Sequence, residues 1–96
     1  MTLASEARVA TSVPRRTMTQ LCKHFEHKLP VTYDETKGRI AFSAGLCLLE
    51  AGADALILRA EAADAESLRR VEDVVARHLD RFAFREKPEI AWKETA

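Results

Sequence analysis

Apolar residues recur along this chain with two different periods, and each change of period marks a predicted element. Residues 7–13 alternate between polar and apolar with period two, which predicts a half-buried strand. From Met18 to Leu29 apolar residues recur every three or four positions, which predicts an amphipathic helix of about four turns. Pro14 suits the first turn of this helix, and Pro30 ends it because the residue before a proline is pushed out of helical geometry.

The middle of the chain predicts a meander of four antiparallel strands with one apolar face. Four short alternating segments are separated by turns at 35–38, at Ala44-Gly45 and at Gly52-Ala53. Apolar residues of each segment then face apolar residues of the next, and the registers agree on a single inner face. The pairs that define these registers are Tyr33 with Ile40, Phe42 with Cys47, and Leu49 with Leu56.

A second amphipathic helix follows the meander. Asp64 is its predicted N-cap, as Ser12 is that of the first helix. Its apolar stripe extends to Phe82 and includes His78. After this helix, residues 89–92 are a candidate for a short terminal strand, with Pro88 at its start.

These elements follow one another in the order β-α-β-β-β-β-α, with an optional last β. Two helices with one apolar stripe each, and a meander with one apolar face, should pack as two layers. We therefore expect an α+β fold, a two-layer sandwich with both helices on one face of an antiparallel sheet. The element order is that of TATA-binding-protein-like folds. At 96 residues the chain is predicted to be a single domain, residues 1–96, with its core at about 7–92.

The charge balance argues against two classes of partner. Fifteen basic side chains face fifteen acidic ones, so the net charge is zero, whereas binding to nucleic acid or an anionic membrane depends on a net basic field. No segment approaches the roughly 20 apolar residues of a membrane-spanning helix, and the N-terminal residues do not resemble a secretory signal. We expect a cytoplasmic protein that binds neither nucleic acid nor membranes.

The outer face of the predicted sheet carries the first candidate site. The derived registers place Asp34, Arg39 and Glu50 in one row, acid-base-acid, and this row is typical of a solvated charge ladder. The same face also presents an apolar strip beside these charges, which instead favours a surface for a partner or ligand. The candidate binding residues are Arg39, Leu46, Leu48, Glu50, Ile57 and Arg59, with Leu46 opposite Arg59.

Histidines carry the second candidate site. His24 and His27 lie three positions apart on the first helix, away from its apolar stripe, and two imidazoles at this spacing can share a metal ion. A metal site needs further ligands, which another subunit or a substrate would have to supply. His78 lies on the core-facing side of the second helix, and the alternative for His24 and His27 is a solvated Lys/His face.

The residues that covalent catalysis requires do not occur in a recognisable arrangement. Cys22 and Cys47 lie in apolar contexts and are expected to be reduced, buried thiols. The chain has no phosphate-binding loop, dinucleotide fingerprint or nucleophile motif. A binding role is therefore favoured over an enzyme, and the sequence requires no cofactor.

Three stretches, residues 21–28, 38–42 and 72–86, resemble a small bacterial family of unknown function. Domains of this family also occur fused or adjacent to siderophore-interacting, flavin-dependent ferric reductases. The resemblance covers residues 7–92 and implies an α+β domain of the bacterial cytoplasm, but it supplies no catalytic residues. His24, His27 and His78 fall on the family's motif without an assigned role.

Three hypotheses follow. The first is a non-catalytic binding or accessory module for a protein or small ligand, for which the resemblance suggests a link to iron or siderophore handling. The second is a small metal-binding protein that uses His24 and His27. The third is an oligomerisation domain that buries the apolar strip or the segment around Trp92 in a homo-oligomer.

Overall fold

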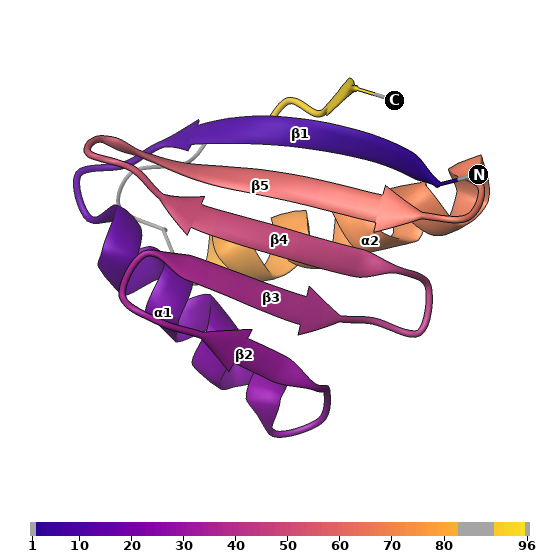
Figure 1. The fold of residues 1–96 in the computed structure, drawn as a ribbon. Helices are drawn as coiled ribbons and strands as arrows, with labels where there is room; N and C mark the ends of the chain where they lie inside the picture. Colours follow the sequence, from indigo (N-terminus) through magenta and orange to yellow (C-terminus); the bar gives the residue numbers. More distant parts are fainter. Residues whose placement is uncertain (1, 83–89, 96) are drawn as a thin grey trace.

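One six-stranded antiparallel sheet carries both helices on a single face (Figure 1). The computed structural model describes residues 2–82 and 90–95, with the side chain of Phe82 left out. The strand order across the sheet is β2-β3-β4-β5-β1-β6. The elements are β1 (Leu3–Ala10), α1 (Pro14–Glu26), β2 (Val31–Tyr33), β3 (Lys37–Ala41), β4 (Leu46–Ala51), β5 (Ala55–Ala62), α2 (Ala65–Phe82) and β6 (Lys93–Glu94).

The predicted fold class is therefore confirmed, including the last strand of the element order. Strand β1 pairs with β5 along all eight of its residues, from Leu3 opposite Ala62 to Ala10 opposite Ala55. This pairing places the first strand inside the sheet, between β5 and β6. Within the described residues, no helix is both long enough and apolar enough to cross a lipid bilayer.

The first strand and first helix lie close to their predicted positions, with different ends. Strand β1 begins at Leu3 rather than at residue 7. Val13, not Ser12, occupies the N-cap of α1, and no side chain caps that helix. The helix ends at Glu26, before the predicted end at Leu29, because the amides of Lys28 and Leu29 both bond back to the carbonyl of Phe25 in a closing turn.

The predicted inner face of the meander is correct, but each of its registers is shifted by two residues. The observed pairs are Val31 with Ile40, Ile40 with Cys47, and Leu49 with Leu58. Side chains alternate with period two along a strand, so a shift of two leaves every residue on its predicted face and changes only its cross-strand neighbour.

The turns explain the shift. Asp34 Oδ1 accepts the amide hydrogens of Thr36 and Lys37, both at 2.8 Å, and the Asp34 amide donates to the Lys37 carbonyl. This tight turn places Lys37 and Gly38 in β3 instead of in the predicted loop. At the next hairpin, Phe42 and Gly45 exchange both backbone hydrogen bonds, so the chain reverses one residue earlier than predicted.

Helix α1 packs closely against β3 at Gly38. A Cβ atom placed on Gly38 would lie 2.9 Å from the Sγ atom of Cys22, closer than van der Waals contact allows. Helix α2 is fixed to the sheet at its other side, where fully buried Ser5 of β1 donates a 2.6 Å hydrogen bond to Glu72 Oε2. The predicted N-cap of α2 is confirmed, because Asp64 Oδ1 accepts the Ser67 amide at 2.7 Å.

The core fills the space between the helices and the sheet. Its largest fully buried side chains come from both layers: Met18, Leu21, Ile40, Leu56, Leu58, Leu68 and Leu79. The terminal strand lies at Lys93–Glu94 and not at residues 90–92, while Glu89 is outside the described residues. Ile90 and Trp92 instead pack against the core, which leaves the polar residues after them to pair with Ser5 and Glu6 of β1.

Candidate functional site on the open face of the sheet

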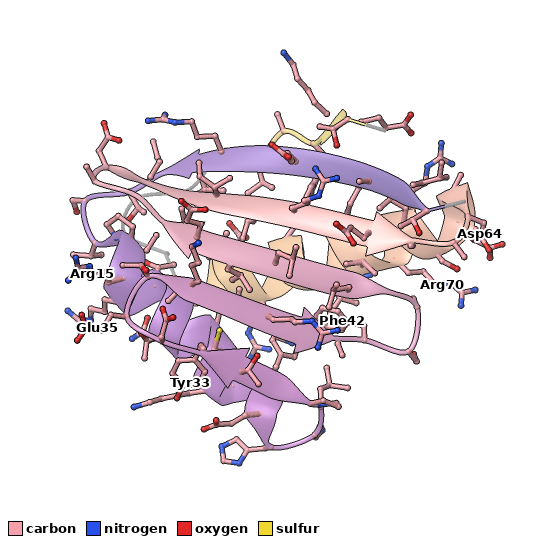
Figure 2. The ribbon with its side chains drawn as sticks, viewed as in Figure 1. Arg15, Tyr33, Glu35, Phe42, Asp64 and Arg70 are labelled. Atoms are coloured by element: carbon pink, nitrogen blue, oxygen red, sulfur yellow. The ribbon has the colours of Figure 1, made fainter. Side chains whose placement is uncertain are left out.

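The helices leave the other face of the sheet open to solvent, and the true registers decide which residues meet there (Figure 2). Arg39 lies between Thr32 of β2 and Leu48 of β4, so the predicted row of Asp34, Arg39 and Glu50 is wrong. Glu50 faces Lys37 on one side and Ile57 on the other. The two-residue shift has therefore replaced an alternating charge ladder by mixed rows of charged and apolar side chains.

The predicted neighbour of Leu46 is also wrong. Leu46 faces Glu61, while Leu48 faces Arg59. Leu46, Leu48 and Ile57 are all half-buried on this face, as expected for a partly covered apolar strip.

A shallow concavity of about 710 Å³ lies on this face, across β2 to β5 and as far as β1. Five of the six predicted binding residues line it, and the sixth, Leu46, does not. The structure adds Glu6 and Tyr33 to the lining. The sequence pattern does not predict the pairing of β1 with β5 that brings Glu6 to this face, and it predicts Tyr33 on the inner face of the sheet. The five predicted residues that line it are Arg39, Leu48, Glu50, Ile57 and Arg59, and Lys37 lines it as well.

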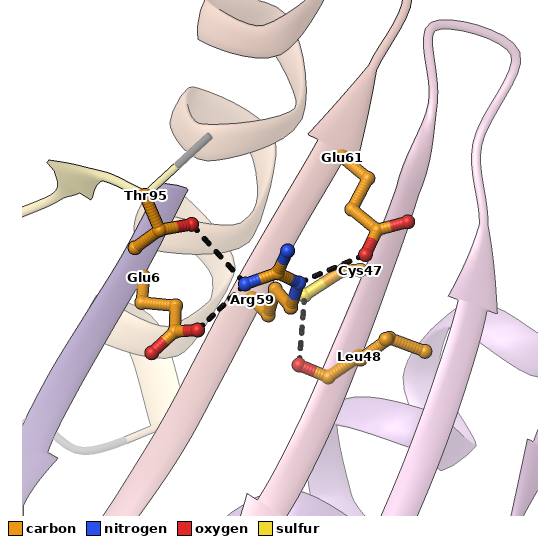
Figure 3. A network of polar contacts seen from close by, with 6 residues as sticks. All are labelled: Glu6, Cys47, Leu48, Arg59, Glu61 and Thr95. Atoms are coloured by element: carbon orange, nitrogen blue, oxygen red, sulfur yellow. Dashed lines mark hydrogen bonds and ion pairs between the residues drawn. The ribbon is translucent and has the colours of Figure 1, made fainter. Parts of the chain in front are cut away.

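Arg59 is held by carboxylates from two strands (Figure 3). Its Nη1 donates to Glu6 Oε2 at 2.7 Å and to Thr95 Oγ1 at 3.1 Å, and its Nε donates to Glu61 Oε2 at 2.9 Å. The hydrogen bond to Glu61, followed by that to Glu6, raises the pKa of Arg59. The donors of this guanidinium are thus bonded to other residues of the protein. Arg59 lines the concavity, but we do not expect its guanidinium to bind a ligand.

Arg39 is in the opposite situation. Its side chain is exposed and forms no ion pair or hydrogen bond with another described residue. It projects from β3 beside Leu48, with Ile57 lining the same concavity. A guanidinium without an internal counter-ion beside apolar side chains is suited to a ligand with an anionic group and an apolar body.

The histidines lie in the other layer of the molecule, on the helices. The ring of His24 lies 4.8 Å, centroid to centroid, from that of His78 on α2. His27 is the C-cap of α1. The pKa of His24 is lowered, mainly by the loss of solvent around its ring and to a smaller extent by the charges of His78 and Arg81. Among the described residues, no group of three or more His, Cys, Asp or Glu side chains is arranged to hold a metal ion.

Both cysteines are free and lie in the core. Burial raises the pKa of Cys22 to about 11 and that of Cys47 to about 12. Because the thiolate is the reactive form, neither thiol is suited to nucleophilic chemistry at neutral pH.

Two comparisons found proteins that are similar to this chain. The sequence profile of a family described as "Uncharacterized protein conserved in bacteria (DUF2218)" matches residues 6–93. The chain is also similar to a solved structure, "NMR structure of PA4090 from Pseudomonas aeruginosa", with 36% sequence identity, 95% coverage of each chain and a TM-score of 0.81. No curated protein matches the chain. Neither description names a ligand, a partner or an association with ferric reductases.

Proposed function

This chain belongs to the bacterial family described as "Uncharacterized protein conserved in bacteria (DUF2218)", and we propose that it is a non-catalytic binding module for a small amphipathic anion. The ligand would lie on the open face of the sheet. The observation that carries this proposal is the exposed Arg39 guanidinium, which has no ion-pair partner among the described residues, at a concavity that Leu48 and Ile57 also line.

The rest of the face supports a ligand with both an anionic and an apolar part. Among the described residues that line the concavity, Arg59 already has two carboxylate partners, and Lys37 faces the acidic Glu50 across the strands. Arg39 instead faces Thr32 and Leu48, so its guanidinium is the cation we assign to the ligand. Guanidinium groups bind carboxylates through two parallel hydrogen bonds, which fix the orientation of the anion. Half-buried Leu48 and Ile57 offer an apolar surface for the remainder of the ligand.

Binding without covalent chemistry fits the positions of the reactive groups. The two thiols lie in the core, and the cross-strand row that contains Arg39 consists of Thr32, Leu48, Arg59, Glu6 and Lys93 in the described part of the sheet. Glu6 is ion-paired with Arg59 at 2.7 Å, so its carboxylate is already engaged within the protein.

The finer part of the proposal is a link to iron handling, and it rests on the sequence resemblance to domains found beside siderophore-interacting reductases. Ferric chelates of carboxylate ligands are anions, so Arg39 could serve as their counter-ion. The surface has the chemistry for such a chelate but does not distinguish it from another amphipathic anion.

Isothermal titration calorimetry with decanoate tests the binding site. We expect R39Q to weaken decanoate binding about 10- to 100-fold, since a hydrogen bond to a charged group contributes about 1.5–3 kcal/mol. L48D should also weaken it, because it places a like charge beside the carboxylate. R15Q, which removes the same charge from exposed Arg15 on α1, is the matched control and should bind as the wild type does.

The outcomes separate the parts of the proposal. If neither decanoate nor ferric citrate binds, the proposed binding site is wrong. It is also wrong if R39Q binds decanoate as tightly as the wild type does. Binding of decanoate without ferric citrate contradicts only the link to iron. If light scattering instead shows a dimer that L48D dissociates, the face is an oligomer interface and the proposal is wrong.

A further inference from the structure

On the helical side of the molecule, an imidazole from α1 lies against an imidazole from α2. The ring centroids of His24 and His78 are 4.8 Å apart, and the two ring planes are inclined by 43°. Phe25 contacts both rings, at 5.3 Å from His24 and 4.7 Å from His78, and is itself supported by Phe42 at 5.2 Å. We propose that His24 and His78 form a two-histidine site for a divalent transition-metal ion of the Zn²⁺ class.

The hydrogen bonding of His78 prepares it as a metal ligand. Its Nδ1 lies 2.7 Å from the carbonyl oxygen of Val74, one turn earlier on α2. A carbonyl oxygen can only accept, so Nδ1 carries the hydrogen, and Nε2 of the neutral ring carries the lone pair. A backbone carbonyl that fixes the tautomer and orientation of an imidazole is the usual outer-shell arrangement around metal-binding histidines.

The separation of the rings is compatible with one shared ion. Two nitrogens that each lie about 2.0–2.1 Å from zinc are within about 4 Å of each other. The 4.8 Å separation of the ring centroids is compatible with this spacing, and His24 lies on the exposed side of α1. In its neutral form, the His24 ring keeps a lone pair on one nitrogen in either tautomer.

The nearby charges oppose a cation, which makes the proposal testable in a second way. Arg81 and Lys28 both act on His24 with positive charge, as does His27. Removal of one of these charges should therefore strengthen metal binding, whereas it would weaken the binding of an anion at the same place. The described residues supply no third protein ligand of the His, Cys, Asp or Glu type, so water or a bound molecule would complete the coordination. The expected site is exchangeable and not a structural zinc site.

This pair differs from the pair that sequence spacing alone suggests. His24 and His27 share a helix, but the ring that lies against His24 is that of His78, 54 positions further along the chain. The site lies on the helices and not on the open face of the sheet, so its test does not depend on the ligand of Arg39.

The experiment is a titration of the full chain with Zn²⁺, followed by calorimetry and by the imidazole ¹⁵N shifts of the three histidines. We expect the shifts of His24 and His78 to change together. H24Q and H78Q should each weaken Zn²⁺ binding about 100-fold, the gain expected when a second linked ligand binds. H27Q is the matched control and should bind at least as tightly as the wild type does, and R81Q should bind up to about fivefold more tightly.

Three results would overturn the proposal. The first is that neither His24 nor His78 responds to millimolar Zn²⁺. The second is that H27Q weakens binding as much as H78Q, which would support the pair within α1 instead. The third is that R81Q weakens binding. His24 is exposed, so H24Q keeps the test decisive even if H78Q disturbs the folding of α2.

Discussion

Substitution of Gly38 by alanine tests the packing of α1 against β3 most sharply. The added methyl group would lie 2.9 Å from Cys22 Sγ, whereas ordinary contact begins at 3.4 Å. Overpacking of this kind destabilises a protein by about 1–3 kcal/mol. Replacing a strand glycine by alanine stabilises it by about 0.5–1 kcal/mol, because the unfolded chain then loses less backbone entropy on folding. We therefore expect G38A to lower the free energy of unfolding by about 1–2 kcal/mol. For a domain of this size the corresponding fall in Tm is about 5–15 °C.

A double-mutant cycle identifies the clashing atom. C22A removes the Sγ atom, so G38A should cost much less in the C22A background, with a coupling energy of about 1–2 kcal/mol. G52A is the comparison variant, because an added Cβ on Gly52, in an exposed turn, would lie 3.2 Å from the Ala55 carbonyl oxygen, a milder overlap that should cost less than that of G38A. Urea unfolding monitored by circular dichroism measures all four variants and the wild type.

Two results would refute this reasoning. If G38A leaves stability unchanged or increases it, Gly38 does not lie under α1. That outcome is the one expected if Gly38 belonged to the hairpin loop. If the effects of G38A and C22A simply add, the methyl group meets some other atom.

Three further predictions concern the helices and the thiols. S5A should lower the free energy of unfolding by about 1.5–3 kcal/mol, because it removes the buried hydrogen bond to Glu72; a loss below about 0.5 kcal/mol in urea unfolding would contradict that bond. A backbone hydrogen bond lowers the pKa of Asp64, so its stabilisation is present above about pH 4 and is lost as the pH falls through the lowered folded value. D64A should therefore reduce Tm at pH 7, and its Tm should fall less than that of the wild type as the pH is lowered. If the Tm values of D64A and the wild type fall in parallel with pH, Asp64 does not act as the cap. Cys22 and Cys47 should react slowly with a disulfide reagent in the native protein and quickly in urea; rapid native reaction would show that the core is open.

The sequence was sufficient for the fold class because periodicity reports which face a residue occupies. Val31, Ile40, Cys47 and Leu58 all lie on the predicted side of the sheet, although every predicted pairing among the meander strands is two residues out. Apolar pairs can be formed equally well in registers that differ by two, so the pattern could not choose between them. The choice depends on turn chemistry, above all on Asp34 closing its turn with two backbone amides.

The candidate sites were less predictable, because a site depends on which neighbours meet. Periodicity predicts the face of the sheet on which the candidate binding residues lie, but the predicted position of Arg39 between two acids is wrong, because it lies between Thr32 and Leu48. This difference converts a neutralised ladder into an available guanidinium. Likewise, spacing along α1 could pair His24 only with His27, whereas the contact with His78 arises from the packing of one helix against the other.

A ¹H–¹⁵N correlation spectrum recorded during titration with decanoate tests the central claim, that the open face of the sheet binds amphipathic anions around Arg39. The account predicts saturable shifts concentrated at residues 32, 39, 48 and 57, and their loss in R39Q but not in R15Q. Shifts confined to α1 and α2, or identical titrations of the wild type and R39Q, would contradict it.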